Sequence, residues 1–344
     1  MNRSNLLPLS HATLRREFLQ GMAAIGTSAV LPGTVLGAQQ TRASRIDVHG
    51  HFMSPIMIET IGAQELGNFA TWSAAKHLDT MEENGVASTM ISIPPHYDPE
   101  LVDRVARPTN EFGARLAQDH PGRFGLMAFL PMPHIDTTLR EIEYALDTLK
   151  ADGVAMYTNY GDKWLGDPAF NPVFEELNRR QAVVFAHPIS ADCCKALLPN
   201  LADTTIEWQT DTTRAIANML FSGAASRYPN VKMIFSHGGG TMPFLVERFN
   251  AAAANAKYKE YFPQGFAGAA AKMFFDTAWT SNAVAMTALR TVVPISQILF
   301  GTDYPARTVT DHVKGLQECG VFNATELQQI ERGNALALFP RLKA

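Results

Sequence analysis

The residues most suited to chemistry are four histidines and one aspartate that lie at, or just after, the ends of short apolar runs. His49 and His51 are two positions apart, so both side chains project from the same side of an extended strand. His187, His237 and Asp303 follow three later apolar runs. Neutral imidazole and carboxylate groups bind zinc and similar ions, and three histidines with one carboxylate leave a position for water or substrate. A His-x-His pair alone is a weak signal, but together these residues predict a catalytic divalent metal site.

The elements that position these residues are eight short β-branched or apolar runs separated by helical patterns. The apolar runs cover residues 46–51, 87–93, 124–131, 153–158, 182–187, 232–236, 273–276 and 297–301, and helical patterns include 138–150 and 172–180. Apolar strands that alternate with helices indicate a parallel sheet covered on both faces. No Gly-x-Gly-x-x-Gly follows the first run, and eight units favour a closed barrel over an open doubly wound sheet. We predict an α/β fold, a (β/α)8 TIM barrel over residues 39–344, with its active site at the carboxyl ends of the strands.

Residues 1–38 have the features of an export signal. Arg15 and Arg16 precede a weakly apolar stretch at 21–36, and small residues at 37 and 38 offer a cleavage point. The segment resembles a twin-arginine signal, and the apolar stretch is too short for a permanent membrane span. We therefore expect the twin-arginine translocation machinery as a partner and a periplasmic location, or a cytoplasmic one if the signal is not used. An uncleaved amphipathic helix is the competing interpretation.

The charge of the chain limits the classes of partner that it could bind. The 344 residues include 29 Lys and Arg against 33 Asp and Glu, a formal charge of −4, and no basic run interleaves with aromatic residues. This composition argues against nucleic-acid binding and favours a small-molecule partner.

The chain has three cysteines, and the adjacent Cys193 and Cys194 are expected to stay unpaired because a bond between neighbours would be strained. No role in stability or metal binding is expected for the thiols.

The chain from about residue 45 to 342 resembles the metal-dependent amidohydrolase superfamily, in the branch of α-amino-β-carboxymuconate-ε-semialdehyde decarboxylase and related aromatic acid decarboxylases. The motifs that carry the resemblance are IDVHGH at 46–51, VFAHP at 184–188, IFSHGGG at 234–240, FGTDYP at 300–305 and GNA at 333–335. The stretches 158–160 and 165–168 are also similar to 6-methylsalicylate decarboxylase-like members. The resemblance implies that one metal ion binds His49, His51, His187 and Asp303, with His237 beside it as an acid/base or substrate-orienting residue. Binuclear members carry a lysine after the fourth strand, and the run 153–158 has none, so a single ion is expected.

The resemblance favours a decarboxylase of a small aromatic or unsaturated carboxylic acid. The metal, with zinc favoured and manganese as the second choice, would chelate the substrate, and His237 or Asp303 would handle the replacing proton. A mononuclear hydrolase of a lactone or amide is the alternative, because the same ligands permit it, and a non-catalytic metal- or solute-binding protein is a third hypothesis. Some aromatic acid decarboxylases of this branch begin with Glu-x-His and carry an acidic residue where this chain has Gly240. These departures place the chain nearer the semialdehyde and methylsalicylate type.

Substrate-contacting residues are expected on loops that follow the predicted strands. The candidates are Phe52, His96, Asn159, Tyr160, Trp279 and Arg307. Aromatic side chains suit a planar substrate and Arg307 could pair with a carboxylate, although aromatic residues at strand ends often serve only in packing. Asp276 is predicted to orient a ligand histidine, with helix capping as the alternative. A homodimer is expected from the resemblance.

Overall fold

A parallel β-barrel forms the centre of the protein. The computed structural model describes residues 44–96 and 98–343, so the predicted export segment lies outside the described residues. Eight parallel strands follow one another in the order β1-β2-β3-β4-β7-β8-β9-β10. Their bounds are β1 (Arg45–His51), β2 (Val86–Ser92), β3 (Phe124–Phe129), β4 (Gly153–Tyr157), β7 (Val183–His187), β8 (Lys232–Phe235), β9 (Phe274–Asp276) and β10 (Ile298–Leu299). Each predicted run is therefore a strand, within a few residues at its ends.

The sheet closes where the chain after β10 meets β1. Gly50 pairs in parallel with Tyr304, and the Asp303 backbone N–H donates to the His49 carbonyl at 2.7 Å. The His51 N–H donates to the Tyr304 carbonyl at the same distance. We call this junction the β1–β10 seam. With it, the predicted TIM barrel is confirmed for the described residues.

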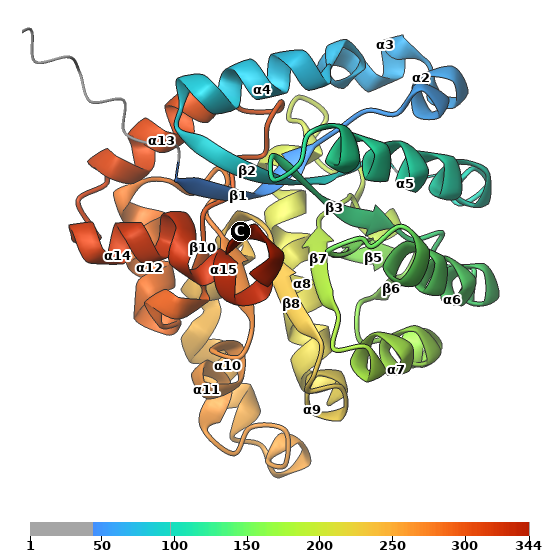
Figure 1. The fold of residues 1–344 in the computed structure, drawn as a ribbon. Helices are drawn as coiled ribbons and strands as arrows, with labels where there is room; N and C mark the ends of the chain where they lie inside the picture. Colours follow the sequence, from blue (N-terminus) through green and yellow to red (C-terminus); the bar gives the residue numbers. More distant parts are fainter. Residues whose placement is uncertain (1–43, 97, 344) are drawn as a thin grey trace, which may run out of the picture. The chain divides into compact units, whose positions relative to one another are not determined.

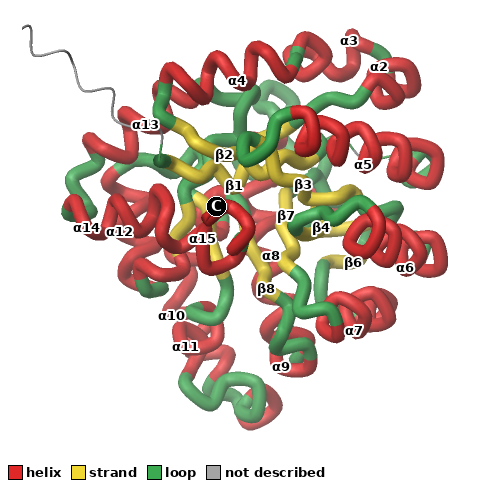
Figure 2. Tube along the Cα trace, in the orientation of Figure 1, coloured by secondary structure: helices red, strands yellow, loops and turns green. Residues whose placement is uncertain are grey.

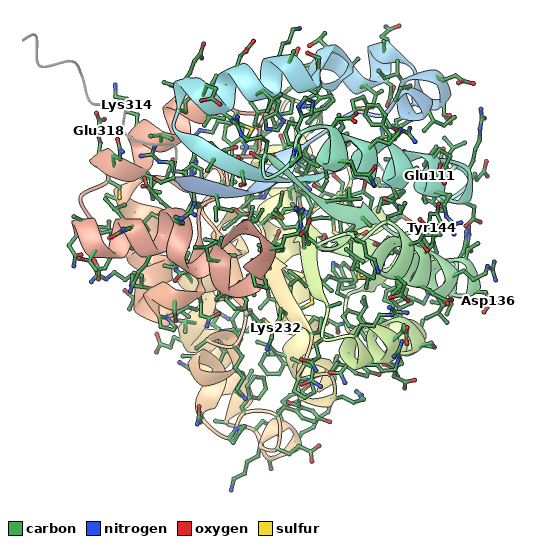
Figure 3. All side chains as sticks on the ribbon, in the orientation of Figure 1. Glu111, Asp136, Tyr144, Lys232, Lys314 and Glu318 are labelled. Carbon is green, nitrogen blue, oxygen red and sulfur yellow. A yellow bond between two sulfur atoms is a disulfide. The ribbon has the colours of Figure 1, made fainter. Side chains whose placement is uncertain are left out.

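Helices surround the strands, as the ring of red tubes in Figure 2 shows. The longer ones are α4 (Ala74–Glu83), α5 (Val102–Asp119), α6 (Ile135–Glu143), α7 (Asn171–Arg179), α8 (Glu207–Phe221), α10 (Val246–Ala253), α12 (Ala283–Val292) and α13 (Val309–Glu318). The helix expected at 138–150 is shorter than predicted, because α6 passes into a wider turn, η2 (Tyr144–Thr148). Tyr144 donates its hydroxyl to Glu111 of α5 at 3.0 Å on the outer surface, which ties this turn to its neighbour (Figure 3). Within the described residues, no helix combines the length and the apolar character needed to cross a bilayer.

Two apolar cores stabilise the barrel. One lies between the strands and the surrounding helices. The other fills the barrel interior, where Ile46, Met90 and Phe185 pack with Phe339 and Leu342 from the C-terminal segment. That segment contains α15 (Asn334–Leu338), so the end of the chain covers the amino-terminal end of the barrel (Figure 1). The loops that carry the predicted site residues lie at the other end of the barrel, at the carboxyl ends of the strands.

Two loop features differ from the sequence prediction. Residues after β4 form a small antiparallel hairpin, β5 (Asn159–Tyr160) with β6 (Lys163–Trp164), which lacks the alternating pattern of a longer strand. Cys193 and Cys194 are joined by a disulfide, so the expectation that they stay unpaired is wrong. They lie in η4 (Asp192–Cys194), a short turn in the loop after β7. The backbone there is not held in a sheet or a long helix, so it can adapt to a bond between neighbours.

Candidate metal centre

The predicted metal residues meet at the carboxyl ends of β1, β7, β8 and β10. One ligand atom from each of His49, His187, His237 and Asp303 lies within 4.8 Å of the others, and all four residues are buried. His51 joins the same cluster, because its Nε2 lies 2.8 Å from Asp303 Oδ1 and 3.2 Å from His49 Nε2. The structure therefore brings all five residues to one point, although residues of β1 and Asp303 are far apart in sequence.

Three of the histidine rings are fixed by their outer nitrogens. Each Nδ1 faces an oxygen that can only accept: Asp276 Oδ2 for His49 (2.8 Å), the Ile93 carbonyl for His51 (2.9 Å) and the Pro188 carbonyl for His187 (2.8 Å). The proton of the neutral ring therefore belongs on Nδ1, and Nε2 presents its lone pair to the cluster. This arrangement orients a histidine as a metal ligand.

The donor set fits a divalent cation. The Nε2 atoms of His49 and His51 and the carboxylate of Asp303 are all acceptors in this state, yet they lie 2.8–3.2 Å apart. The buried Nε2 of His187 has no hydrogen-bond partner among the described residues. Buried acceptors that face one another repel unless a cation lies between them. Three imidazole nitrogens and one carboxylate oxygen are a ligand set for zinc or a similar ion.

His237 is held differently from the other histidines. Its Nδ1 is buried without a partner among the described residues, and its Nε2 lies 3.4 Å from Asp303 Oδ2. Its backbone is in the left-handed region at φ 56°, as is that of Asp303 at φ 65°. Non-glycine residues rarely adopt this conformation, and such strain is concentrated at functional sites. Because no carbonyl fixes Nδ1, the His237 ring can change its tautomer, which suits a group that transfers protons.

Burial and charge set the protonation states of the cluster. Burial lowers the pKa of His51 and holds that of His187 well below its usual range, so both rings are neutral. For His49, burial acts in the same direction, but the carboxylates of Asp276 and Asp303 outweigh it and raise the pKa to about 10. For Asp303, burial favours the neutral form, but the charge of His49 and three hydrogen bonds hold the pKa well below its usual range. The carboxylates of Asp276 and Asp303 therefore surround a positive charge. When no metal ion is bound, the protonated His49 ring carries that charge.

Two buried aspartates support the ligands. Asp276 accepts from the His49 ring with one oxygen and, with the other, from the backbone N–H groups of His237 (2.9 Å) and Ala278 (3.0 Å). Asp47 accepts from the His49 backbone N–H at 3.0 Å and from the Thr302 hydroxyl at 2.6 Å, so it ties β1 to the loop that carries Asp303. The sequence predicts a supporting role for Asp276 but gives none to Asp47. The signal for Asp47 was a charged residue inside the apolar run 46–51.

Trp279 and Arg307 lie against the cluster. The Trp279 indole N–H donates to Asp303 Oδ2 at 2.7 Å. The Arg307 guanidinium carbon lies 5.5 Å from the centre of the Trp279 ring. Trp208, which the sequence did not single out, lies edge-on to the His187 ring, with the two ring centres 5.6 Å apart.

The other candidate substrate residues are engaged in packing or hydrogen bonds. Phe52 is buried in the outer core and stacks on Phe112. Asn159 uses its amide to donate to the Ile189 carbonyl at 3.0 Å and to Asp211 at 2.7 Å. The buried hydroxyl of Tyr160 accepts from the Tyr157 backbone N–H at 2.9 Å, and the half-buried His96 offers its carbonyl to the Tyr157 hydroxyl. Phe52, Asn159 and Tyr160 thus use their side chains in contacts with the protein itself, whereas the contact of His96 is made by its backbone carbonyl.

Comparison with known proteins gives a family and relatives of similar length. A family model described as Amidohydrolase matches residues 46–341. "Decarboxylase yanB" of Aspergillus niger is 34% identical over 324 residues, which cover 87% of this chain and 88% of that protein. "6-Methylsalicylic acid decarboxylase" of Penicillium expansum is 34% identical over 319 residues, which cover 87% of this chain and 97% of that protein.

Several solved structures are similar in fold, and the one described next holds a metal ion. It is a dihydroxybenzoic acid decarboxylase from a Polaromonas species, with bound manganese and the inhibitor 2-nitroresorcinol. It matches with a TM-score of 0.73 and 20% identity, covering 88% of this chain and 98% of that chain. At this identity the similarity establishes the fold alone.

Proposed function

The chain belongs to the amidohydrolase family, and on that premise we propose that it is a metal-dependent decarboxylase of a small aromatic or unsaturated carboxylic acid. It is then a carbon–carbon lyase, like the relatives named as decarboxylases that are 34% identical to it. The observation that carries the proposal is the convergence of imidazole lone pairs and the Asp303 carboxylate on one buried point, with the unfixed His237 ring beside it.

The reaction divides the site residues into two roles. His49, His51, His187 and Asp303 would hold a divalent ion, which supplies positive charge that stabilises negative charge on the substrate oxygens when bound. The carbon–carbon bond breaks, carbon dioxide leaves, and the electron pair left on the substrate carbon takes up a proton. His237 provides that proton in this proposal, because Asp303 directs one oxygen to the ligand histidines and the other to Trp279.

We propose zinc as the resident ion, with manganese as the second choice. Three neutral imidazoles and one carboxylate match the ligand preference of zinc. The manganese in the Polaromonas relative supports a hard divalent ion as the alternative.

The test combines metal analysis with a carbon dioxide release screen. The purified metal-loaded protein is incubated with hydroxybenzoates and muconate-type acids, before and after chelation and after metal is added back. About one ion per chain and chelator-sensitive release of carbon dioxide are expected. Bound metal with no release from any acid, but with hydrolysis of a lactone or amide, would replace the lyase proposal with the hydrolase alternative.

We also propose that the protein acts in the periplasm after twin-arginine export. Arg15 and Arg16 and the short apolar stretch that follows support this location. Cell fractionation of the full chain should place the wild type outside the cytoplasm. A variant with both arginines changed to lysine should stay inside, and an unchanged distribution would refute use of the signal.

A further inference from the structure

Trp279 is an unusual tryptophan. Trp279 is 52% exposed, although tryptophan is normally mostly buried. Its backbone is left-handed at φ 57°, and it follows β9 in the loop that leads to α12. A bulky residue in this conformation is costly and persists only where the surroundings hold it in place. Here the hydrogen bond to Asp303 holds the indole.

Asp303 is the junction at which Trp279 acts. Oδ1 faces the Nε2 atoms of His49 and His51, whereas Oδ2 accepts from Trp279 at 2.7 Å and lies 3.4 Å from His237 Nε2. The short, charge-assisted bond from the indole therefore fixes the plane of the carboxylate. In this orientation one oxygen faces the ligand histidines and the other faces His237.

The Arg307 guanidinium lies over the indole and forms no ion pair with a carboxylate among the described residues. Its guanidinium carbon is 5.5 Å from the centre of the Trp279 ring, a cation–π contact. Among the described residues the side chain forms no hydrogen bond and has no carboxylate within 4.0 Å, although the residue is half-buried. Its backbone N–H donates to the Asp303 carbonyl at 3.2 Å, which keeps it beside the metal centre. A half-buried arginine beside a catalytic centre is suited to an anion supplied by the substrate.

We propose that Trp279 and Arg307 form one substrate-recognition unit, in which Trp279 positions Asp303 and Arg307 binds the substrate carboxylate. The inference rests on the proposed function, because it takes the substrate to be a carboxylic acid. The π-face of Trp279 holds the Arg307 guanidinium, and its N–H edge holds Asp303. Trp279 therefore places the substrate carboxylate, bound to Arg307, close to Asp303, which faces His237. Substrates that lack a carboxylate lose the Arg307 contact.

The two residues should have separable kinetic effects. The carboxylate charge disappears when carbon dioxide forms, so Arg307 stabilises the bound acid more than the transition state. Arg307→Gln should raise KM about tenfold with kcat within about threefold of wild type. The KM of Arg307→Lys should lie between those of the wild type and Arg307→Gln. Trp279→Phe keeps the ring under Arg307 but removes the N–H. It should lower kcat about tenfold or more with KM within about threefold, and Trp279→Gln should recover part of kcat by restoring a donor.

Two variants serve as matched controls. Trp164→Phe also removes an indole N–H from a carboxylate, the 2.6 Å bond to Asp211, but it leaves Asp303 untouched and should keep kcat near wild type. Arg104→Gln removes an exposed arginine whose ion-pair contact with Glu59 is 3.7 Å, and it should leave KM unchanged. An unchanged kcat in Trp279→Phe, or an unchanged KM in Arg307→Gln, would overturn the corresponding half of the proposal.

A binding measurement separates this inference from the proposed function. Calorimetric titration of the metal-loaded protein with benzoate and with benzamide needs no turnover. Wild type should prefer benzoate, and Arg307→Gln should weaken benzoate about tenfold while benzamide binding stays the same. Equal losses for both probes would refute carboxylate recognition by Arg307, even if wild type releases carbon dioxide. A selective loss would sustain it even if no acid in the screen is decarboxylated.

Discussion

Replacing Asp276 with asparagine should weaken metal binding although Asp276 is not itself a ligand. The carboxylate accepts the Nδ1 proton of His49 at 2.8 Å, and both side chains are fully buried. An asparagine of the same size can still accept from the backbone N–H groups of His237 and Ala278 through its oxygen. Its NH2 group then faces His49 Nδ1, so the ring proton must move to Nε2. A protonated Nε2 cannot bind a metal ion.

The size of the effect follows from this change of tautomer. Loss of a partner that orients a ligand histidine typically costs 10–100-fold in metal affinity, or about 1.4–2.8 kcal/mol. At a fixed metal concentration well above both dissociation constants, the metal-dependent part of the stability should fall by the same amount. Competition with a chromogenic chelator measures the affinity, and calorimetric unfolding with and without metal measures the stability.

Asp47→Asn is the matched control for this experiment. Asp47 is another buried carboxylate next to His49, but it accepts from backbone N–H groups and the Thr302 hydroxyl and contacts no imidazole ring. Its replacement should lower the stability of both the metal-free and the metal-loaded protein, with metal affinity within about threefold of wild type. Equal metal affinities in Asp276→Asn and wild type would refute the tautomer argument. Equal losses in both variants would show that general damage near β1 explains the effect.

Three further predictions test the roles of single groups. His187→Ala should lose bound metal and activity together, whereas His237→Gln should lose activity but retain most of its metal. Metal analysis and carbon dioxide release measure the two effects. Equal metal loss in both variants would refute the assignment of His187 as a ligand and His237 as the proton donor. Chelation should lower the melting temperature of wild type, and zinc or manganese should restore it, whereas a melting temperature insensitive to metal would contradict a metal centre on the β1–β10 seam. Hydrogen bonds from Arg179 and Arg180 lower the pKa of Glu176 to about 2 from 4.5, so its stabilisation is complete above pH 4.5 and is lost as the pH falls towards 2. Glu176→Gln should therefore destabilise the protein by about 1 kcal/mol at pH 7 and by less at pH 3 in urea unfolding, and a loss independent of pH would refute this reasoning.

The strand-end residues were predictable because a local pattern determines them. Each strand of the barrel is a short apolar run, and parallel strands place their carboxyl ends at one edge. A histidine at the end of β7 and an aspartate after β10 were therefore assigned to one site without knowledge of their contacts. The hydrophobic periodicity contains this information.

The contacts beyond the strand ends were less predictable, since they depend on where loops fold back. Asn159 and Phe52 follow strands as the prediction required, yet the structure engages Asn159 with Asp211 and buries Phe52 in the outer core. No sequence pattern indicates that α8 brings Asp211 to the end of β4. The disulfide between Cys193 and Cys194 likewise depends on the local backbone of one turn.

The β1–β10 seam also determines when the centre can be completed during synthesis. His51 precedes Asp303 by 252 positions, yet the two side chains lie 2.8 Å apart. A ribosome makes the two histidines of β1 long before Asp303, so for much of its synthesis the growing chain holds only part of the proposed ligand set. Metal loading would therefore follow the synthesis of β10. A bound ion would then cross-link the first and last strands of the barrel.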